Sequence, residues 1–453
     1  MATADENYEA TIALLTTHGQ TDLLSYISSL DNEGRRTLLS SLSTMSISEI
    51  FANHVPSALN SKAPTNITHF PSTNVTTSES KSTETTTSQV VSPCIMAGGA
   101  GTRLGFPGPK GCYPLIRNKR LYDFLIPRCD VCLVTGAPIL IMTSPVNHAE
   151  TTAWFEKRSW YSSHGFSSSN FILFQQDTLP SLSSPLTSSP QILLQNPTTP
   201  TSSPNGNGGI FTSLFTHSLL PLLTQKNVTA LHVFGIDNLL TIPCDSTFIS
   251  SVSSSDVGNK IIRKDYPEEK IGVMAQSDGS NIVVEYSDLS EEDKNLKDGE
   301  GNLVYSLGNI CSHYFSVGFL SRLEKVKPTY HIANKKIEVY DIKSKEIKEV
   351  EAVKLETFVF DVFKEATSVE VVEVQREAEF APIKNKEGKD SRDSALGLLT
   401  AMWKGRVGTE GLEEVEILDI EGWSGNEDKI RASVQKRASS GEKIITVWTQ
   451  EWE

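Results

Sequence analysis

The sequence has no long apolar run, no excess of basic residues and few cysteines. No stretch approaches the roughly 18 consecutive apolar residues of a membrane-spanning helix, so we expect no membrane partner. The first ten residues, MATADENYEA, are acidic and lack the basic and apolar regions of a secretory signal. Six cysteines in 453 residues are too few for a disulfide framework, so we expect a reduced, cytoplasmic chain.

Positive charge is also scarce. Lys and Arg total 41 against 55 for Asp and Glu, which gives a net charge of -14. We therefore expect no nucleic-acid partner, and an anionic ligand would need a local positive pocket. Cys129 and Cys132 form a single CxxC with no second pair, and neither HExxH nor GxSxG occurs. Zinc chemistry and a serine nucleophile therefore have no support.

Composition divides the chain into four expected regions. Residues 1–55 carry leucines and isoleucines at three- and four-residue steps, which favours an amphipathic helix pair. Residues 56–89 are rich in Ser and Thr and predict a flexible linker. Residues 90–405 form the expected central domain. Residues 406–453 contain short apolar runs and predict a small, β-rich C-terminal domain.

The central region alternates apolar strands with helical stretches. The expected strands are VVSPCIM from Val90, 137–144, 170–176 and 229–238, and the helices include His148–Arg158 and Ile210–Leu223. Residues 180–204 are rich in Ser, Thr and Pro and read as loop, while the strands from Ile271 onward look mixed in direction. This alternation predicts an α/β fold with a mixed sheet flanked by helices.

A glycine-rich segment, MAGGAGTRLG, follows the first of these strands and precedes PKG. Gly98 and Gly99 would let backbone N–H groups approach a phosphate closely. Arg103 offers a planar fork for phosphate oxygens, and Lys110 offers a point charge. The alternative is a plain tight turn with surface cations. The segment is neither a Walker A loop nor GxGxxG.

Three further features could bind a nucleotide. Gly206 and Asn207 lie in GNGG before a helical stretch, which suits an anion, although a helix cap is the plainer interpretation. Asp237 ends an apolar strand, where ligands bind in α/β sheets and where Mg²⁺ finds oxygen ligands, but an Asp there commonly caps a loop. Gln176 follows another strand and could read a pyrimidine edge, or be solvated.

Other polar residues are weaker signals on their own. Glu285 and Tyr286 lie in IVVEYSDL, Asn309 lies in GNI, and Lys354 and Lys384 are isolated lysines. Most residues of these types are structural or solvated, so none would be singled out alone.

The order of these segments is more specific than any one of them. AGGAGTRLG with PKG, NFILFQQDTLP, PNGNGGIF, FGIDN, VVEYSDLS, GNICSHYFS, YHIANKKI, ETFVFDVF and EFAPIKN follow in series. In this series the chain resembles the eukaryotic UDP-N-acetylhexosamine pyrophosphorylases, over most of residues 10–405. The resemblance implies a Rossmann-like, glycosyltransferase-A-like nucleotidyltransferase fold with an N-terminal helical extension.

The resemblance also implies a set of roles. A nucleotide site would comprise Ala97, Gly98, Gly99, Lys110, Gln176, Gly206, Asp237 and Lys354. A sugar site would comprise Asn207, Glu285, Tyr286, Asn309, Phe358, Phe360 and Lys384. Arg103 and Lys110 would be the catalytic cations, and Asp237 the ligand of Mg²⁺, with Mn²⁺ as a substitute.

The implied reaction joins UTP and N-acetylglucosamine 1-phosphate into UDP-N-acetylglucosamine and pyrophosphate. Broader use of glucose or galactose 1-phosphate, or a catalytically silent nucleotide-sugar-binding protein, are the alternatives. We expect a monomer or homodimer. Ala100 departs from the family, which usually has Gln there, and the C-terminal part is shorter than in the family.

Overall fold

The computed structural model describes residues 4–61, 64–71, 74–77, 89–116, 119–158, 165–407, 416–420, 427–441 and 444–447. The chain forms two compact units built from interleaved stretches. Unit 1 consists of Met1–Thr65, Gln176–Ser213 and Lys325–Asp361; unit 2 consists of Asn66–Gln175, Leu214–Glu324 and Val362–Glu453. The sequence did not indicate that two stretches of the expected central domain would pack with the N-terminal helices.

The N-terminal part of unit 1 is helical, as predicted, but it has more pieces than a helix pair. It contains α1 (Ala4–Thr17), α2 (Thr21–Ser29), α3 (Asn32–Ser43), α4 (Ile47–Glu49), the π-helix η1 (Ile50–His54) and α5 (Val55–Asn60). Gly19, at φ +67°, separates the first two helices. Asp31 caps α3 by accepting a hydrogen bond from the Gly34 N–H at 2.7 Å.

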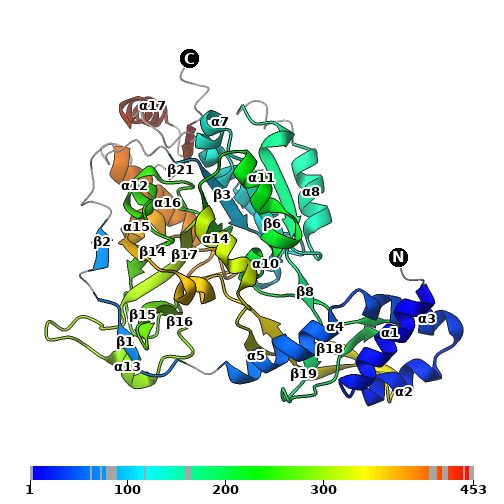
Figure 1. Cartoon of the computed structure of the whole chain (residues 1–453). Coiled ribbons are helices and arrows are strands. Elements are labelled where there is room, and N and C mark those ends of the chain that lie inside the picture. Colours follow the sequence, from blue (N-terminus) through cyan, green and yellow to red (C-terminus); the bar gives the residue numbers. More distant parts are fainter. Residues whose placement is uncertain are drawn as a thin grey trace. The chain divides into compact units, whose positions relative to one another are not determined.

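A five-stranded sheet, in the order β11-β10-β18-β19-β9, completes unit 1. The strands of the unit are β8 (Thr178–Leu179), β9 (Leu182–Ser183), β10 (Leu194–Asn196), β11 (Thr199–Pro200), β12 (Ser203–Pro204), β18 (His331–Asp341) and β19 (Glu346–Glu356). The expectation of loop over 180–204 is wrong, because Leu182, Ile192 and Leu194 are buried in one core with the helices. Figure 1 shows the blue N-terminal helices beside the yellow β18 and β19.

Unit 2 is built around an eleven-stranded mixed sheet with the main order β2-β20-β14-β17-β13-β3-β6-β7. Its strands are β1 (Ile67–His69), β2 (Val75–Thr77), β3 (Val91–Met96), β6 (Ile139–Thr143), β7 (Phe171–Gln175), β13 (Ala230–Gly235), β14 (Val257–Arg263), β15 (Val273–Ser277), β16 (Ser280–Val284), β17 (Leu307–Ser316) and β20 (Val369–Glu373). Strands β13, β3, β6 and β7 are parallel neighbours, whereas β17 runs antiparallel to both β13 and β14. The predicted mixed α/β sheet is confirmed.

The strand order reverses direction at β3. From β3 the chain moves through β6 to β7 on one side, and β13 then pairs on the other side of β3. Met96 and Gly235, which end these two strands, are opposite each other in the register. Ligands of open α/β sheets bind at such a switch point, beyond the carboxyl ends of the strands. The fold therefore marks the ends of β3 and β13 as the place for a site.

Short helices and turns connect the strands of unit 2. They are η4 (Thr102–Leu104), η5 (Lys110–Cys112), α6 (Leu121–Leu125), η6 (Pro127–Cys129), α7 (Val131–Thr135), α8 (His148–Glu156), η7 (Ser168–Asn170), α11 (Leu219–Gln225), α12 (Ser246–Val252), α13 (Glu291–Asn295), α14 (Val317–Arg322), α15 (Arg376–Glu379) and α16 (Arg392–Val407). The two-stranded pair β4 (Pro114–Ile116) and β5 (Lys119–Arg120) follows η5, while α10 (Gly209–Thr216), η8 (Leu323–Lys325) and η9 (Asp361–Glu365) cross unit boundaries. No helix among the described residues is both long and apolar enough to cross a membrane.

The helix expected over Ile210–Leu223 is instead two helices, α10 and α11. Ser218 has φ +53°, in the left-handed region, and breaks the backbone between them. Pro221 lacks an N–H and is tolerated in the first turn of the second helix, where no intrahelical donor is needed.

The segment 56–89 is not wholly a linker. Helix α5 and strands β1 and β2 interrupt it, with β1 pairing with β15 and β2 with β20. The few apolar residues among the Ser and Thr, such as Ile67 and Val75, are sufficient to add these strands to the sheet. The remainder of this prediction, at 62–63, 72–73 and 78–88, falls outside the described residues.

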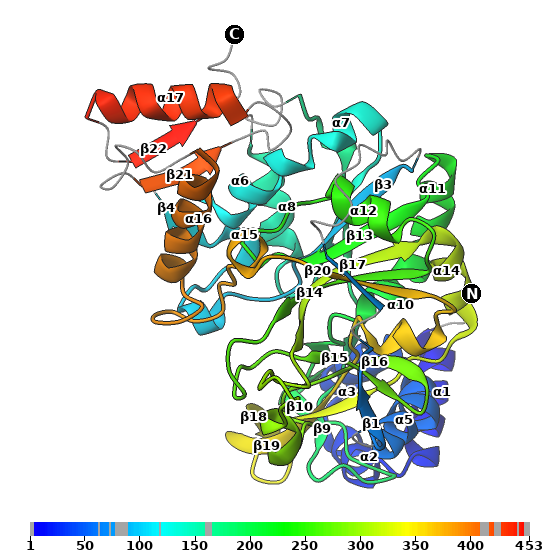
Figure 2. The same ribbon diagram turned by 90° about the vertical axis from the view of Figure 1, so that its left-hand side faces the viewer.

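The C-terminal region contains a helix that the expected β-rich domain did not include. Strands β21 (Glu416–Ile420) and β22 (Ile444–Val447) pair in parallel, and α17 (Glu427–Ser439) lies between them in sequence. Parallel strands require a crossover connection, and here the crossover is helical. Figure 2 shows α17 alongside the two strands.

Candidate functional site

The glycine-rich loop after β3 folds back on itself. The N–H of Gly101 donates to the carbonyl of Gly108 at 3.0 Å, and the N–H of Lys110 donates to the carbonyl of Gly99 at 3.2 Å. Because the second half of the loop returns in this way, Lys110 lies beside the end of β3. A methyl group added to Gly99 would meet nothing within 4 Å, so the backbone here has open space beside it.

Two buried side chains from the end of β6 hold this loop by its carbonyl groups. Asn147 Nδ2 donates to the carbonyls of Ala97 at 2.9 Å and Gly99 at 3.2 Å. Ser144 Oγ donates to the carbonyl of Gly98 at 2.7 Å, and its N–H donates to Asn147 Oδ1 at 2.9 Å. Three successive carbonyls are thereby fixed, so the loop keeps one backbone conformation.

No sequence motif pointed to Ser144 or Asn147. The available signal was their position, since TSPVN is a polar cluster directly after a buried parallel strand. The pattern does not show that β3 and β6 are paired strands. This pairing brings Ser144 and Asn147 to the glycine loop.

Lys110, Asp237 and Lys384 form a charged cluster at the switch point. Lys110 Nζ lies 3.3 Å from Asp237 Oδ2. The N–H of Ile383 donates to the carbonyl of Asp237 at 2.8 Å, which brings the adjacent Lys384 to the same carboxylate. Burial by itself would raise the pKa of Asp237, but Lys110 and Lys384 outweigh it and hold that pKa below its ordinary value. The cluster carries a surplus of positive charge, as a phosphate site requires.

Arg103 lies apart from this cluster. It belongs to η4, in the turn that the Gly101–Gly108 contact closes, and its side chain is exposed. It makes no ion pair with any described residue. Its catalytic role stays a prediction.

Glu285 and Asn309 are neighbours in unit 2. The Asn309 N–H donates to the carbonyl of Gly272 at 2.8 Å, and a methyl group on Gly272 would lie 3.4 Å from Glu285 Oε1. Burial, with the charges of Asp237 and Glu285, raises the pKa of Cys311 to about 12, which links this pair to the charged cluster. Tyr286 follows Glu285 and is 38% exposed.

In unit 1, the GNGG loop is bound to the chain segment that carries the predicted aromatic pair. The Gly208 N–H donates to the carbonyl of Thr357 at 3.0 Å, and Asn207 Oδ1 accepts from the Val359 N–H at 3.0 Å. These contacts bring Gly206 and Asn207 close to the segment that carries Phe358 and Phe360.

The aromatic pair itself is rigidly supported. The rings of Phe358 and Phe360 stack with centroids 5.2 Å apart, and His331 packs on Phe358 at 4.6 Å. His331 Nε2 also pairs with Asp361 Oδ1 at 2.9 Å, and Asp361 Oδ2 accepts from the Phe358 N–H at 2.7 Å. A flat aromatic surface is thus held in a fixed orientation.

Lys354 and Gln176 are the two other predicted site residues of unit 1. Lys354 is on β19, opposite Ala333 of β18, and its side chain makes no ion pair with any described residue. Gln176 directly follows β7 and is 6% exposed. Their contacts with a nucleotide stay predictions.

Asp237 is the residue predicted to bind Mg²⁺. Among the described residues, no three His, Cys, Asp or Glu side chains are placed to share a metal ion. Mg²⁺ in nucleotide sites commonly takes one or two carboxylates, and water and substrate phosphates supply the other ligands. The half-buried carboxylate of Asp237 fits that arrangement, with one oxygen already paired to Lys110.

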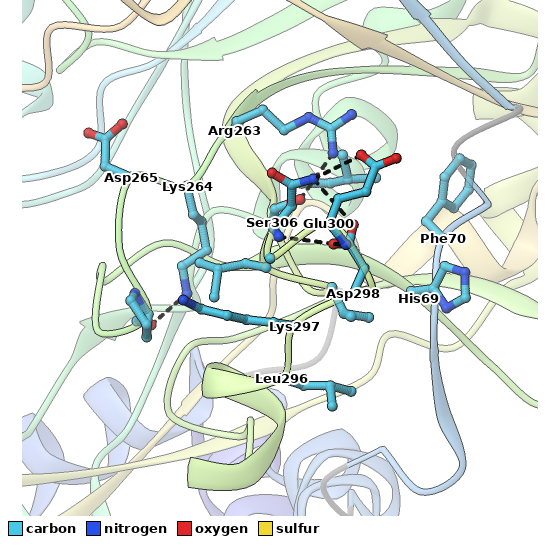
Figure 3. A pocket seen from close by; sticks show the side chains of 16 residues that line it. His69, Phe70, Arg263, Lys264, Asp265, Leu296, Lys297, Asp298, Glu300 and Ser306 are labelled. Atoms are coloured by element: carbon cyan, nitrogen blue, oxygen red, sulfur yellow. Dashed lines mark hydrogen bonds between the residues drawn. The ribbon is translucent and has the colours of Figure 1, made fainter.

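A cavity of about 1050 Å³ lies elsewhere in unit 2 and is lined by none of the predicted site residues. Figure 3 shows that cations, among them Arg263 and Lys264, and carboxylates, among them Asp298 and Glu300, both line it. Its lining mixes both signs of charge, so it does not single out an anionic ligand.

The six cysteines all belong to the described residues, and none of them forms a disulfide. Cys129 and Cys132 are buried, and burial raises the pKa of both thiols, that of Cys132 to about 12. This environment suits packing rather than metal binding.

The chain is similar to several known proteins. A human protein named UDP-N-acetylhexosamine pyrophosphorylase-like protein 1 is 34% identical over 348 residues, which cover 71% of this chain and 67% of that protein. UDP-N-acetylglucosamine diphosphorylase 2 of Arabidopsis thaliana is 33% identical over 328 residues, covering 66% of this chain and 62% of that protein. The chain thus spans about two thirds of the length of these curated relatives.

A solved structure shows the same fold. It is the uridine diphosphate N-acetylglucosamine pyrophosphorylase of Trypanosoma brucei in complex with an inhibitor, at TM-score 0.76 and 22% identity, covering 97% of this chain and 98% of that one. A family model described as UTP--glucose-1-phosphate uridylyltransferase matches residues 50–404. The chain therefore belongs to the UTP--glucose-1-phosphate uridylyltransferase (UDPGP) family.

Proposed function

We propose that this chain is a uridylyltransferase that converts UTP and N-acetylglucosamine 1-phosphate into UDP-N-acetylglucosamine and pyrophosphate. The observation that carries the proposal is the Lys110–Asp237–Lys384 cluster beside a clamped glycine loop at the switch point of the sheet. The names of the relatives support the acetamido sugar over glucose.

The reaction proposed is an in-line displacement at phosphorus. A non-bridging oxygen of the sugar 1-phosphate attacks the α-phosphorus of UTP, and the bond from that phosphorus to the bridging oxygen of the β-phosphate breaks. A phosphate monoester has a second pKa of about 6 and is largely dianionic at neutral pH, so no general base is needed. Catalysis then depends on positioning and on neutralising charge.

The residues of unit 2 are suited to these two tasks. The N–H groups of the glycine loop would approach the nucleotide, because the clamp from Ser144 and Asn147 has already satisfied the loop carbonyls. Lys110 and Lys384 would neutralise phosphate oxygens, and Arg103 would add a planar donor. Mg²⁺ or Mn²⁺ held by Asp237 would supply further charge neutralisation when bound.

The residues of unit 1 would bind the base and the sugar. Gln176 would read uracil, with Gly206 and Lys354 in the nucleotide site. Asn207 would contact the nucleotide or the sugar. In unit 2, Glu285, Tyr286 and Asn309 would hold the sugar. The stacked Phe358 and Phe360 offer a flat apolar surface for an acetamido group. We further propose a cytoplasmic monomer or homodimer.

The test is pyrophosphate release from UTP and Mg²⁺, with three acceptors compared side by side. These are the 1-phosphates of N-acetylglucosamine, N-acetylgalactosamine and glucose. Phe358→Ala should reduce any preference for the acetamido sugars over glucose, and Lys157→Ala, an exposed lysine, is the control.

Release that requires an acetamido sugar supports the proposal. Equal release with glucose 1-phosphate would overturn the assigned sugar and favour a broad UDP-sugar pyrophosphorylase. UTP binding by the folded chain without release from any acceptor would overturn the enzymatic function and favour the silent binding protein.

A further inference from the structure

Unit 2 also contains a buried ion triad that shares no residue with the charged cluster. Lys260 on β14 is 1% exposed at its side chain and pairs with Asp245 at 2.7 Å and with Glu379. Asp245 is the N-cap of α12, and Glu379 is the last residue of α15. One ammonium group therefore ties together a strand and the ends of two helices.

The energetics of such a triad point to geometry rather than to stability. Removing charges from water costs several kcal/mol per ion by general estimates, and replacing a buried ion pair with apolar residues is often neutral or stabilising. Here Lys260 also packs against the Phe248 ring at 5.1 Å, in a core that could have been apolar. What the ions supply, and apolar packing does not, is a directional contact at Glu379.

The chain that leaves Glu379 runs directly to the charged cluster. The carbonyl of Glu379 accepts from Asn238 Nδ2 at 2.7 Å, and Asn238 Oδ1 accepts from the Ala381 N–H at 2.9 Å. The Ile383 N–H donates to the carbonyl of Asp237 at 2.8 Å. Residues 379–383 are thus paired with Asp237 and Asn238, the second and third residues after β13, and Lys384 comes next.

We propose that Glu379, held by its ion pair with Lys260, is a positioning residue that sets the register of segment 379–383 and so places Lys384 against Asp237. The expected effect on kcat rests on the proposed function. The expected effect on the backbone of residues 379–383 does not. Glu379 touches neither Asp237 nor Lys384, and it acts through the backbone that joins them.

The test is Glu379→Gln, which keeps the size of the side chain and leaves Lys260 paired with Asp245. We expect a folded protein whose kcat falls about 10–100-fold, because small displacements of reacting groups have effects of this size. The matched control is Glu373→Gln, which removes a carboxylate paired with Arg263 at the end of β20. We expect it to leave kcat within about twofold, as for a solvent-accessible ion pair.

A double-mutant cycle separates positioning from a general structural defect. If Glu379 acts through Lys384, Glu379→Gln should have almost no further effect on kcat in the Lys384→Ala background. Equal fold-losses in both backgrounds would overturn the proposal. So would wild-type kcat in Glu379→Gln.

A readout independent of activity is hydrogen exchange over residues 379–385. Glu379→Gln should speed exchange at Ala381 and Ile383, and Glu373→Gln should not. Unchanged exchange would overturn the positioning role. If exchange is faster in Glu379→Gln and the wild-type chain itself releases no pyrophosphate, the positioning role stands and only the proposed function is overturned.

Discussion

The two glycine-rich loops differ in what their glycines make room for. In the GNGG loop of unit 1, a methyl group on Gly206 would lie 2.3 Å from the carbonyl oxygen of Thr357, and one on Gly208 would lie 2.7 Å from the carbonyl carbon of Phe358. In the loop of unit 2, a methyl group on Gly99 would meet no atom within 4 Å. The first loop needs glycine to pack against its own chain, whereas Gly99 has no such neighbour.

The two loops are also held by partly different contacts. Both have backbone–backbone hydrogen bonds, Asn205 and Gly208 with Thr357 in unit 1, and Gly101 with Gly108 in unit 2. In unit 2, two buried side chains from outside the loop, Ser144 and Asn147, also donate to its carbonyls. Open space beside a fixed backbone is what an incoming phosphate needs, so we expect substitution of Gly206 or Gly208 to change stability and substitution of Gly99 to change nucleotide binding.

The largest effect is expected for Lys110→Ala, which removes the cation that the unit 2 loop delivers to Asp237. Turnover should fall about 10²–10³-fold, by analogy with loss of one preorganised donor to developing charge. Steady-state kinetics and the thermal midpoint measure the two properties together. Lys157→Ala is the control, and near wild-type turnover in Lys110→Ala would remove this lysine from the reaction.

Gly206→Ala should lower the free energy of unfolding by about 3 kcal/mol, in the range for clash and strain at special backbone positions. Gly206 has φ +91°, so the variant combines left-handed strain with a backbone collision. Gly279→Ala separates the two, because Gly279 has φ +80° but open space around it. Urea denaturation should give Gly279→Ala the smaller loss, and equal losses would contradict the collision.

Asn147→Ala should weaken UTP binding about tenfold and cost about 1–3 kcal/mol of stability, since the carbonyls of Ala97 and Gly99 lose their donor. Asn147→Asp sharpens the comparison, because a carboxylate can accept from Ser144 but cannot donate to Ala97 and Gly99. Calorimetric titration with UTP reports the binding. Unchanged affinity in both variants would show that the loop holds its shape without the clamp.

Gly99→Ala isolates the open space beside the unit 2 loop. Its unfolding free energy should stay within about 0.5 kcal/mol of wild type, as for sites without a packing role, while UTP affinity falls. Gly318→Ala, at another glycine with open space, is the control for both measurements. A loss of stability without a loss of UTP binding would reverse the assignment of the two loops.

The smallest effect concerns pH. Burial would raise the pKa of Asp237, but Lys110 and Lys384 hold it below the ordinary 3.8. Its ionised form therefore stabilises the fold fully above that ordinary value, and the contribution is lost as pH falls through the folded pKa. Denaturation between about pH 6 and pH 3 should show the gap between wild type and Asp237→Asn narrowing in acid. A constant gap would mean that the lysines do not stabilise this carboxylate.

Much of the sheet could be predicted because its strands are short, apolar and closed by turn residues. Strands β3, β6, β7 and β13 lie where the apolar runs indicated. The short strands within 180–204 could not be predicted. Their polar composition resembles loop, and only burial of Leu182 and Leu194 against the N-terminal helices makes them strands.

The site was accessible to sequence reasoning only in part. The glycines with Arg103 and Lys110 indicated a phosphate site, and the position of Asp237 after an apolar strand indicated a Mg²⁺ ligand. The structure brings Lys110 and Asp237 together. Asn147 and Glu379 act through contacts to residues 50 and 141 positions away along the chain, to Ala97 and Asn238. Such contacts depend on which strands become neighbours, which local patterns do not encode.

The interleaving of the two units has a consequence for how the chain can be cut. Each unit takes three separate stretches of sequence, so six alternating stretches are joined at five points. No single truncation can therefore release either unit whole, because each unit combines stretches from three different parts of the sequence. Excised pieces would expose the leucine-rich faces that the missing stretches normally cover. We therefore expect folding to be completed only when the whole chain is available, because the N-terminal helices pack with strands encoded more than 300 residues later.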